Sequence, residues 1–294
     1  VVDIINSGSV HIVENGLERL VAKTVASGNL VASTDLQKAD VYLICVPTPF
    51  EKDTKLPDLS YVISAVENIC SILKENDLLI LESTVPVGTI EQLASMIKIK
   101  RPDLFKNTND VDTLSVHLAY CPERVLPGNV LHEIVANSRI IGGINKTAPC
   151  EATKFYSQFV NGELKITNSK TAEMVKLAEN SFRDVNIAFA NELSMICDNL
   201  GVDVWDLIEF SNLHPRVNIL TPGPGVGGHC IAVDPWFIVS SDPKNAKLIA
   251  KARQVNDAKP DWVVKKFKLL IESYVARYEV KSSQIRVNVC GLSF

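Results

Sequence analysis

The feature that most constrains the fold is an alternation of short apolar runs with helical patterns over the first half of the chain. Strand-like runs cover residues 41–46, 78–83, 116–121 and 139–142, and each is followed by Pro, Gly or a capping residue. Over 58–73, apolar residues recur at helical spacing, and Asp58 can cap the first turn. This alternation predicts an α/β unit with a mainly parallel sheet covered on both faces. Ligands of such sheets bind at the carboxyl ends of the strands, here the segments 47–49, 83–88 and 122–128.

The second half of the chain is predicted to be helical. From 171 to 200 it runs without Gly or Pro, which is long enough to cross a small domain. Helical periodicity resumes near Pro243, and Pro260 is expected to kink or restart that helix, because proline lacks the N–H that the helix needs. The later part carries an apolar stripe suited to packing against another domain or subunit.

The composition excludes several classes of function. With 30 basic against 34 acidic side chains and no basic block, the chain is a poor partner for nucleic acid. Its longest apolar runs are strand-sized, well short of the roughly 18 to 20 residues of a membrane span, so we expect a soluble protein.

Seven scattered cysteines, with no Cys-x-x-Cys pair and no signal peptide, indicate a reducing cytoplasm. His117 and Cys121 are four residues apart but lack a second pair at zinc spacing, so we expect core packing and no metal site.

The loop 222–230 carries the most chemistry. Gly223, Gly225 and Gly228 have the dinucleotide spacing G-x-G-x-x-G, but no strand precedes them. A phosphate loop is excluded too, because His229 and Cys230 occupy the positions of its Lys and Ser or Thr. What is left is a backbone with few side chains that ends at a thiol. It fits either a nucleophile, with Asp234 one helical turn further on, or a tight structural loop around a buried cysteine.

A polar stripe on the long helix favours the nucleophile. Lys176, Asn180 and Arg183 fall at i, i+4 and i+7, within about 40° of one another on the helical wheel. A solvated helix face is the usual explanation of such a stripe. However, a cation near a thiol lowers its pKa and can stabilise an oxyanion, and an amide adds a neutral donor. Loop and stripe together describe a catalytic site.

Four motifs then resemble one enzyme family. Residues 83–88, 120–128, 171–180 and 225–234 are similar, in the right order, to the nucleotide-sugar dehydrogenases of the UDP-glucose 6-dehydrogenase superfamily. The stretches 180–192 and 214–236 look like the bacterial UDP-N-acetyl-D-mannosamine dehydrogenase branch. Val233 stands where UDP-glucose enzymes commonly have lysine, which supports an acetamido sugar.

The resemblance implies the domain organisation. Residues 1–165 would form an NAD-binding Rossmann-type domain without its first strand, helix and strand. Residues 166–280 would form an all-helical central domain for dimerisation and catalysis. Residues 281–294 would begin a C-terminal α/β domain that binds UDP, of which only the first strand is present. Both ends of the chain are therefore expected to be cut.

The resemblance also implies an NAD-dependent, four-electron oxidation of a UDP-sugar C6 alcohol to a carboxylate. Cys230 would trap the aldehyde as a thiohemiacetal and then carry a thioester. Lys176 and Asn180 would stabilise oxyanions, while Asp234 and Glu123 would manage protons and water. Residues expected at the cofactor are Val46, Pro47, Thr48 and Thr84. Residues expected at the UDP-sugar are Arg124, Val125, Arg183, His214, Arg216 and Gly227.

Some alternatives stay open at this stage. The preferred substrate is UDP-N-acetyl-D-mannosamine, with UDP-glucose and UDP-N-acetylglucosamine as rivals. A homodimer or higher homo-oligomer is expected, in which Arg216 reaches a neighbouring subunit's site. The chain could instead be an inactive helical dimer-core fragment, or a cysteine hydrolase, although no His is well placed as the base of a hydrolase.

Overall fold

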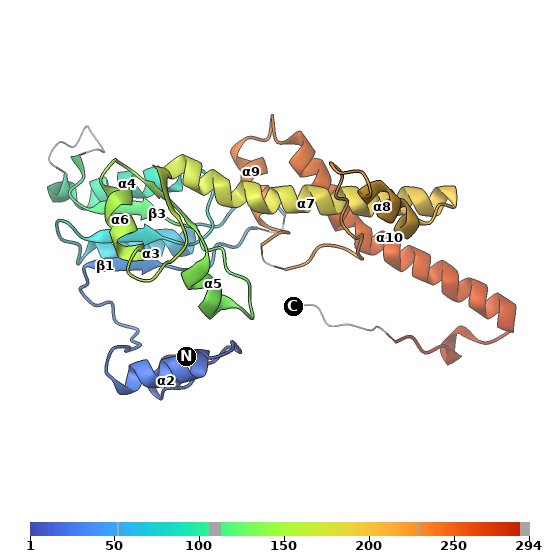
Figure 1. Ribbon diagram of the computed structural model, residues 1–294, viewed down its shortest axis with the longest axis horizontal. Helices are drawn as coiled ribbons and strands as arrows, with labels where there is room; N and C mark the ends of the chain where they lie inside the picture. Colours follow the sequence, from blue (N-terminus) through green and yellow to red (C-terminus); the bar gives the residue numbers. More distant parts are fainter. Residues whose placement is uncertain (52, 106–112, 229, 289–294) are drawn as a thin grey trace. The chain divides into compact units, whose positions relative to one another are not determined.

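The computed structural model describes residues 1–51, 53–105, 113–228 and 230–288 (Figure 1). The chain divides into two compact units. The first comprises Val1–Glu51 and Pro57–Lys176, and the second comprises Lys52–Leu56 and the chain from Leu177 onward. The division falls inside one long helix, α7 (Ser169–Leu200), so the domain limits 165/166 and 280/281 stay predictions.

The first unit contains a five-stranded sheet in the order β1-β2-β3-β4-β5. The strands are β1 (Val41–Ile44), β2 (Leu78–Leu81), β3 (His117–Tyr120), β4 (Arg139–Gly143) and β5 (Leu164–Asn168). All neighbouring pairs are parallel except β3 and β4, which are antiparallel. The mainly parallel sheet is therefore confirmed, whereas β5 was not predicted as a strand.

Helices cover both faces of this sheet, as the alternation predicted. The unit's helical segments, in chain order, are α1 (Val2–Asn6), α2 (Leu17–Ala26), α3 (Ser60–Cys70), α4 (Thr89–Lys100), η1 (Pro102–Leu104), α5 (Val130–Ala136) and α6 (Ala148–Tyr156). Leu79 and Leu81 of β2 pack with apolar residues of α3 and α4, whereas Leu78 and Ile80 point the other way and pack with α6. Asp58 accepts a hydrogen bond from the Ser60 amide at 2.9 Å, but the N-cap position of α3 is Leu59, which makes no side-chain cap, so Asp58 lies one residue before the expected capping position.

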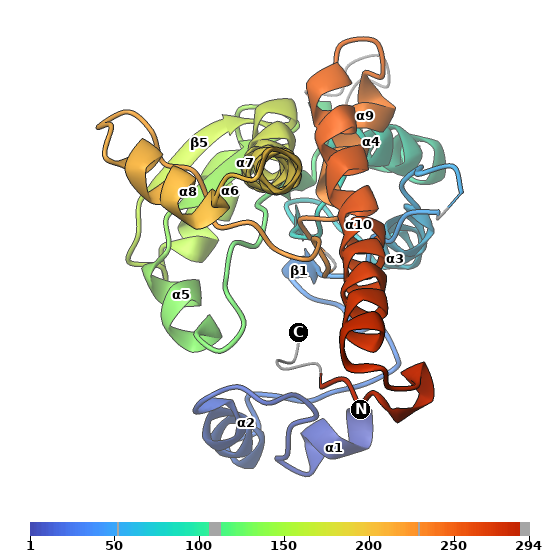
Figure 2. The same cartoon turned by 90° about the vertical axis from the view of Figure 1, so that its right-hand side faces the viewer.

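The second unit is helical. After the C-terminal part of α7 come α8 (Val204–Asn212), α9 (Asp234–Ser241), α10 (Lys247–Tyr278) and η3 (Ser282–Gln284). Figure 2 shows α7 end-on with the long α10 passing it. Pro260 was expected either to kink this helix or to start a new one. Helix α10 is continuous through Pro260, so the prediction of a new start is wrong. The Pro260 ring occupies space that Gly225 leaves open, because a Cβ at Gly225 would lie 2.8 Å from Cγ of Pro260.

Residues 285–288 have no regular secondary structure, and 289–294 lie outside the described residues, so the first strand of a third domain stays a prediction. Within the described part of the chain, no helix is both long and apolar enough to span a membrane. In the same residues, no three His, Cys, Asp or Glu side chains gather as they would around a metal ion.

Candidate active site

The glycine loop ends in a helical turn that begins at Cys230. The carbonyl oxygen of Cys230 accepts hydrogen bonds from the amides of Val233, at 3.0 Å, and Asp234, at 2.9 Å. Asp234 is the first residue of α9. The turn expected between the thiol and Asp234 is therefore present, and Cys230 is exposed. The alternative, a structural loop around a buried cysteine, is wrong.

Glycine is required within this loop. Gly228 has φ +86°, a left-handed conformation that strains residues with a side chain, and Gly225 has no room for a Cβ against Pro260. Nothing lies within 4 Å of a Cβ at Gly227, which is exposed. At the described glycines 225, 227 and 228, the loop before Cys230 therefore presents backbone and no side chains.

Asn180 and Asp234 meet in the second unit. The Asn180 Nδ2 amide donates to Oδ2 of Asp234 at 2.5 Å, and both side chains are buried, at 7% and 3% exposed. Asn180 is therefore not part of a solvated helix face, which was the other explanation of the polar stripe. Arg183, in the same stripe, is exposed to solvent. One hydrogen bond connects α7 to the helical turn that carries the thiol.

Lys176 and Glu123 meet in the first unit. Nζ of Lys176 donates to the main-chain oxygen of Glu123 at 2.8 Å. The Glu123 carboxylate accepts from the Arg124 amide and lies 3.2 Å from Nη1 of the buried Arg139. Because Lys176 and Glu123 belong to the first unit and Cys230, Asn180 and Asp234 to the second, the structure describes two halves of the predicted site, each by itself.

The residues predicted at the cofactor lie at the carboxyl ends of β1 and β2. The Ser83 hydroxyl accepts from the Val46 amide at 2.9 Å and donates to the Val46 carbonyl at 2.7 Å. This pair of bonds joins the segment of Pro47 and Thr48 to the segment of Thr84. Thr48 and Thr84 are partly buried and Pro47 is exposed, so the edge is accessible where parallel sheets bind ligands.

The remaining predicted substrate residues are divided between the units. Arg124 and Val125 are partly buried in the first unit, and Nη1 of Arg124 donates to the Ser138 carbonyl at 3.3 Å. His214 and Arg216 are exposed in the second unit, where the Arg216 amide donates to Nδ1 of His214 at 3.3 Å.

The cysteines differ in accessibility. Burial raises the pKa of Cys121 to about 12, so its thiol stays protonated near neutral pH. The buried thiols among the described residues are those of Cys70, Cys121 and Cys197, and the exposed ones are those of Cys45, Cys150 and Cys230. Among the exposed thiols, Cys230 is the one in a glycine loop next to a bonded Asn–Asp pair.

Sequence reasoning gave no role to Glu173, although it lies in one of the quoted motifs. Its carboxylate is fully buried and accepts from the amides of Gly88, at 2.6 Å, and Ile90, at 2.9 Å. It thereby holds the end of the segment 83–88 and the first turn of α4. Burial raises the pKa of Glu173 to about 7, although both amide donors favour the charged form.

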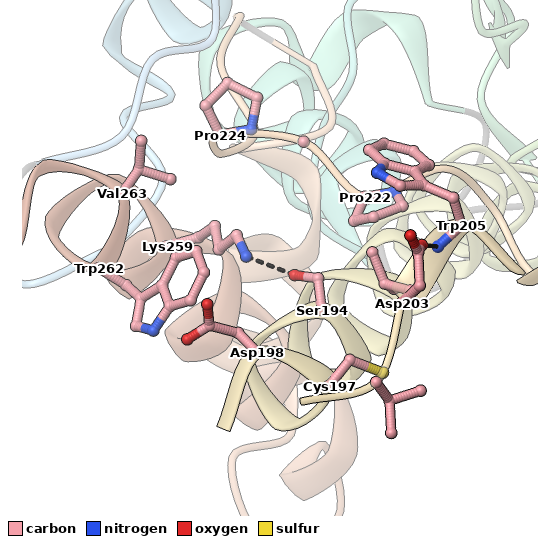
Figure 3. Close-up of a pocket in the computed structure, with 13 residues that line it drawn as sticks. Ser194, Cys197, Asp198, Asp203, Trp205, Pro222, Pro224, Lys259, Trp262 and Val263 are labelled. Carbon is pink, nitrogen blue, oxygen red and sulfur yellow. Dashed lines mark hydrogen bonds between the residues drawn. The ribbon is translucent and has the colours of Figure 1, made fainter. Parts of the chain in front are cut away.

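A pocket of about 490 Å³ lies elsewhere in the second unit. Its walls come from the end of α7, the start of α8, the middle of α10 and the loop at Pro222 and Pro224 (Figure 3). None of the predicted site residues lines it.

Known proteins similar to this chain agree on one family. A UDP-N-acetyl-D-mannosamine dehydrogenase of Yersinia pestis is 52% identical over 293 residues, covering 100% of this chain and 70% of the relative. An NDP-N-acetyl-D-galactosaminuronic acid dehydrogenase of Ralstonia nicotianae is 56% identical over 267 residues, covering 91% of this chain and 63% of the relative.

Solved structures agree with these relatives. The UDP-D-ManNAc dehydrogenase of Pyrococcus horikoshii has a TM-score of 0.84 at 39% identity, covering 96% of this chain and 65% of that one. The UDP-N-acetyl-mannosamine dehydrogenase of Staphylococcus aureus has a TM-score of 0.81 at 42% identity, covering 92% and 63%. This chain therefore spans about two thirds of the length of its relatives.

Two family models match consecutive parts of the chain. Residues 1–160 match the NAD binding domain of the UDP-glucose/GDP-mannose dehydrogenase family, and residues 170–258 match its central domain. The predicted family, the nicotinamide cofactor and the dehydrogenase class are confirmed at this level. The chain belongs to the UDP-glucose/GDP-mannose dehydrogenase family.

Proposed function

We propose that the protein containing this chain oxidises the C6 alcohol of UDP-N-acetyl-D-mannosamine to the uronate, with two NAD⁺ reduced per sugar. The names of its relatives support the substrate. The observation that carries the chemistry is the exposed Cys230, one helical turn before an Asp234 that is bonded to Asn180. A thiol in this position can trap an aldehyde, and the neighbouring groups can handle charge and protons.

The first oxidation turns the alcohol into an aldehyde. NAD⁺ supplies the hydride acceptor in both oxidations. The hydroxyl proton passes to Asp234 or Glu123, directly or through water. The Cys230 thiolate then adds to the aldehyde carbon, and the resulting oxyanion is stabilised by the Lys176 ammonium and the Asn180 amide.

The second oxidation removes the remaining hydride from the thiohemiacetal carbon and leaves a thioester on Cys230. Water, activated by a carboxylate, adds to the thioester carbonyl, and the carbon–sulfur bond breaks to release carboxylate and thiol. Four electrons leave the sugar and reach two NAD⁺, so the reaction balances without another oxidant. Covalent capture also keeps a reactive aldehyde on the enzyme.

The residues present fit one part of an NAD site. The edge formed by Val46, Pro47, Thr48 and Thr84 provides backbone and hydroxyl groups at the carboxyl ends of two parallel strands. The glycine-rich turn that grips the pyrophosphate in such sheets is not part of this sequence. We place the nicotinamide end of the cofactor at this edge.

A second candidate substrate is an NDP-N-acetyl-D-galactosamine. The Ralstonia relative named for galactosaminuronic acid is 56% identical, against 52% for the Yersinia relative, although over fewer residues. The two candidates share the acetamido group and differ in ring stereochemistry. UDP-glucose and UDP-N-acetylglucosamine stay as the predicted rivals.

The experiment is a substrate panel with the product of the complete reading frame. NADH absorbance and residual nucleotide sugar are measured together for the four sugars. We expect two NADH per UDP-N-acetyl-D-mannosamine consumed and slower turnover of the others. A sugar product without NADH would support the cysteine hydrolase, and no turnover of any sugar would contradict the dehydrogenase function. Either result overturns the proposal. No NADH from residues 1–294 alone, beside an active complete protein, would support the inactive dimer-core fragment.

Replacing the thiol separates the two oxidations. The Cys230→Ser variant is expected to give no uronate and at most a single NADH per sugar, because a serine hydroxyl forms neither stable hemiacetal nor thioester. Cys150→Ser is the matched control, since it makes the same change at another exposed thiol. Uronate production by Cys230→Ser at the control rate would contradict the covalent scheme.

We further propose a homo-oligomer working in the cytoplasm. Exposed apolar side chains recur along one side of α7, at Phe182, Phe189, Ile196 and Leu200. Their spacing of seven and four residues makes a continuous stripe on a helix. A second copy of the chain is the proposed occupant, and Arg216 is proposed to reach the partner subunit's site.

A further inference from the structure

The two long helices of the second unit meet around buried polar side chains that the proposed chemistry does not use. Helix α7 contributes Asp184 and Asn191, and α10 contributes Arg253, Asn256 and Lys259. Each is at most 3% exposed. Burying this many polar groups destabilises the folded state unless they are hydrogen-bonded. Their hydrogen-bond partners therefore indicate the role of the cluster.

Four of these side chains form one connected row. Nη1 of Arg253 lies 2.5 Å from Oδ1 of Asp184, which also accepts from Nδ2 of Asn256 at 2.8 Å. Oδ1 of Asn256 in turn accepts from Nδ2 of Asn191 at 2.9 Å. The row runs from an ion pair at one end to a neutral amide at the other.

The last contact of the row leaves the helices. Oδ1 of Asn191 accepts from the main-chain amide of Gly223 at 2.9 Å. Gly223 stands near the start of the glycine loop that leads to Cys230, and Gly225 packs against Pro260 two residues later. In the described part of the loop, a hydrogen bond thus ties Gly223 to α7, and Gly225 packs against Pro260 of α10.

Lys259 also joins the two helices, and its ammonium lies 3.4 Å from the main-chain oxygen of Asn191, so it is connected to the same row. Its ammonium donates to the Ser194 hydroxyl on α7 and lies 4.0 Å from the centre of the Trp262 ring. Figure 3 shows this amine directed at Ser194, with Pro222 and Pro224 on another part of the pocket wall. The Ser194 hydroxyl also donates to the main-chain oxygen of Asn191 at 2.6 Å. These contacts involve the backbone of Asn191 and leave its side-chain Oδ1, the acceptor of the Gly223 amide, unchanged.

We propose that Asn191 is a positioning residue for the Cys230 thiol, acting through the Gly223 amide. The inference rests on the proposed function, in which that thiol traps the aldehyde. A glycine-rich backbone has many accessible conformations and few side chains with which to hold itself. A rigid external acceptor therefore fixes where the loop starts, and a displacement of about 1 Å at reacting groups can cost roughly a hundredfold in rate.

The test alters the contact from both sides in the product of the complete reading frame. Asn191→Ala removes the acceptor, and Gly223→Pro removes the N–H donor and places a ring carbon where that N–H met Oδ1 of Asn191. Gly223→Ala keeps the donor, and the nearest atom to its added Cβ is the Gly225 oxygen at 3.9 Å. Ser194→Ala removes the contacts of the Ser194 hydroxyl with Lys259 and with the main-chain oxygen of Asn191, and keeps the Asn191 side chain that accepts from Gly223.

Two quantities are measured for each variant. One is the split between kcat and the KM for NAD⁺, and the other is the rate of iodoacetamide alkylation of Cys230, followed on its peptide by mass spectrometry. We expect Asn191→Ala and Gly223→Pro to lower kcat roughly a hundredfold with the KM for NAD⁺ within about twofold. Their Cys230 alkylation rates are expected to change about threefold or more, with both controls close to the unaltered protein.

The outcomes separate the two proposals. If Gly223→Pro folds and keeps the kcat and alkylation rate of Gly223→Ala, Asn191 does not position the thiol and the inference is wrong, whatever Asn191→Ala does to stability. If the unaltered protein oxidises no nucleotide sugar, the proposed function fails. The alkylation rates then still decide whether the contact holds the loop.

Discussion

The buried Glu173 makes a pH prediction whose size follows from its surroundings. Burial raises its pKa from 4.5 to about 7. Since the native state then holds the proton more tightly than the unfolded chain, this group stabilises the fold fully below about pH 4.5. That stability is lost as the pH rises through 7. At 1.36 kcal/mol per pKa unit, the loss between pH 5 and pH 8 is about 2.5 kcal/mol.

The perturbation is Glu173→Gln, which removes the titration. Gln can accept from only one of the two amides of Gly88 and Ile90, so the variant is expected to be less stable overall by about 1–3 kcal/mol. The informative quantity is how this difference changes with pH. The free energy of unfolding of the unaltered protein minus that of Glu173→Gln is expected to be about 2.5 kcal/mol larger at pH 5 than at pH 8.

The assay is urea unfolding at pH 5 and pH 8, followed by far-UV circular dichroism. Tryptophan fluorescence is unsuitable, because the three tryptophans, Trp205, Trp236 and Trp262, all lie in the second unit. Glu91→Gln removes a carboxylate from the first turn of α4, the turn whose Ile90 amide Glu173 accepts from, and supplies the comparison. A difference between unaltered protein and Glu173→Gln that is equal at both pH values, or larger at pH 8, would refute the reasoning.

Further predictions concern packing and assembly. Arg253→Met should destabilise the protein by about 3–5 kcal/mol in urea unfolding, because it leaves Asp184 buried without its cation. Gly143→Ala should cost about 1–3 kcal/mol in the same assay, because the new Cβ would lie 2.2 Å from Cδ of Pro149. Phe189→Asp should shift the oligomer toward monomer in light scattering, and an unchanged mass would remove α7 from the proposed interface.

The sheet could be predicted where its strands are apolar throughout. Strand β2 is buried at every position, and its continuous apolar run marked it in the sequence. Strand β5 was missed because Leu164–Asn168 is nowhere fully buried and mixes Lys, Thr and Asn with its apolar residues. Such an edge strand forms by hydrogen bonding to β4, which a pattern of hydrophobicity does not report.

In the candidate site, contacts between residues close in sequence could be predicted, whereas contacts between distant residues could not. Cys230 and Asp234 are four positions apart, so their placement on one side of a helical turn could be anticipated from spacing, and the turn is present. The contacts from Asn191 to Gly223 and from Glu173 to Gly88 join residues 32 and 85 positions apart. Neither follows from spacing, because each depends on how whole helices pack. Both acceptors were hidden among ordinary polar residues of a long helix.

The buried row beside the glycine loop is poorly explained by stability. Burial raises the pKa of Asp184 in the row and lowers the pKa of the neighbouring Lys259, because the charged form of each loses solvation in the folded state. Well-packed apolar residues of similar volume often stabilise a protein as much as a buried ion pair, or more. Apolar residues, however, offer no acceptor to a main-chain amide. The polar row offers such an acceptor, Oδ1 of Asn191, to the amide of Gly223. Its position is fixed by α7, which carries Asn191, and by the hydrogen bond to Asn256 of α10. The desolvation cost of the row is therefore consistent with a role in fixing the position of the loop, in which four of the nine residues 222–230 are glycine.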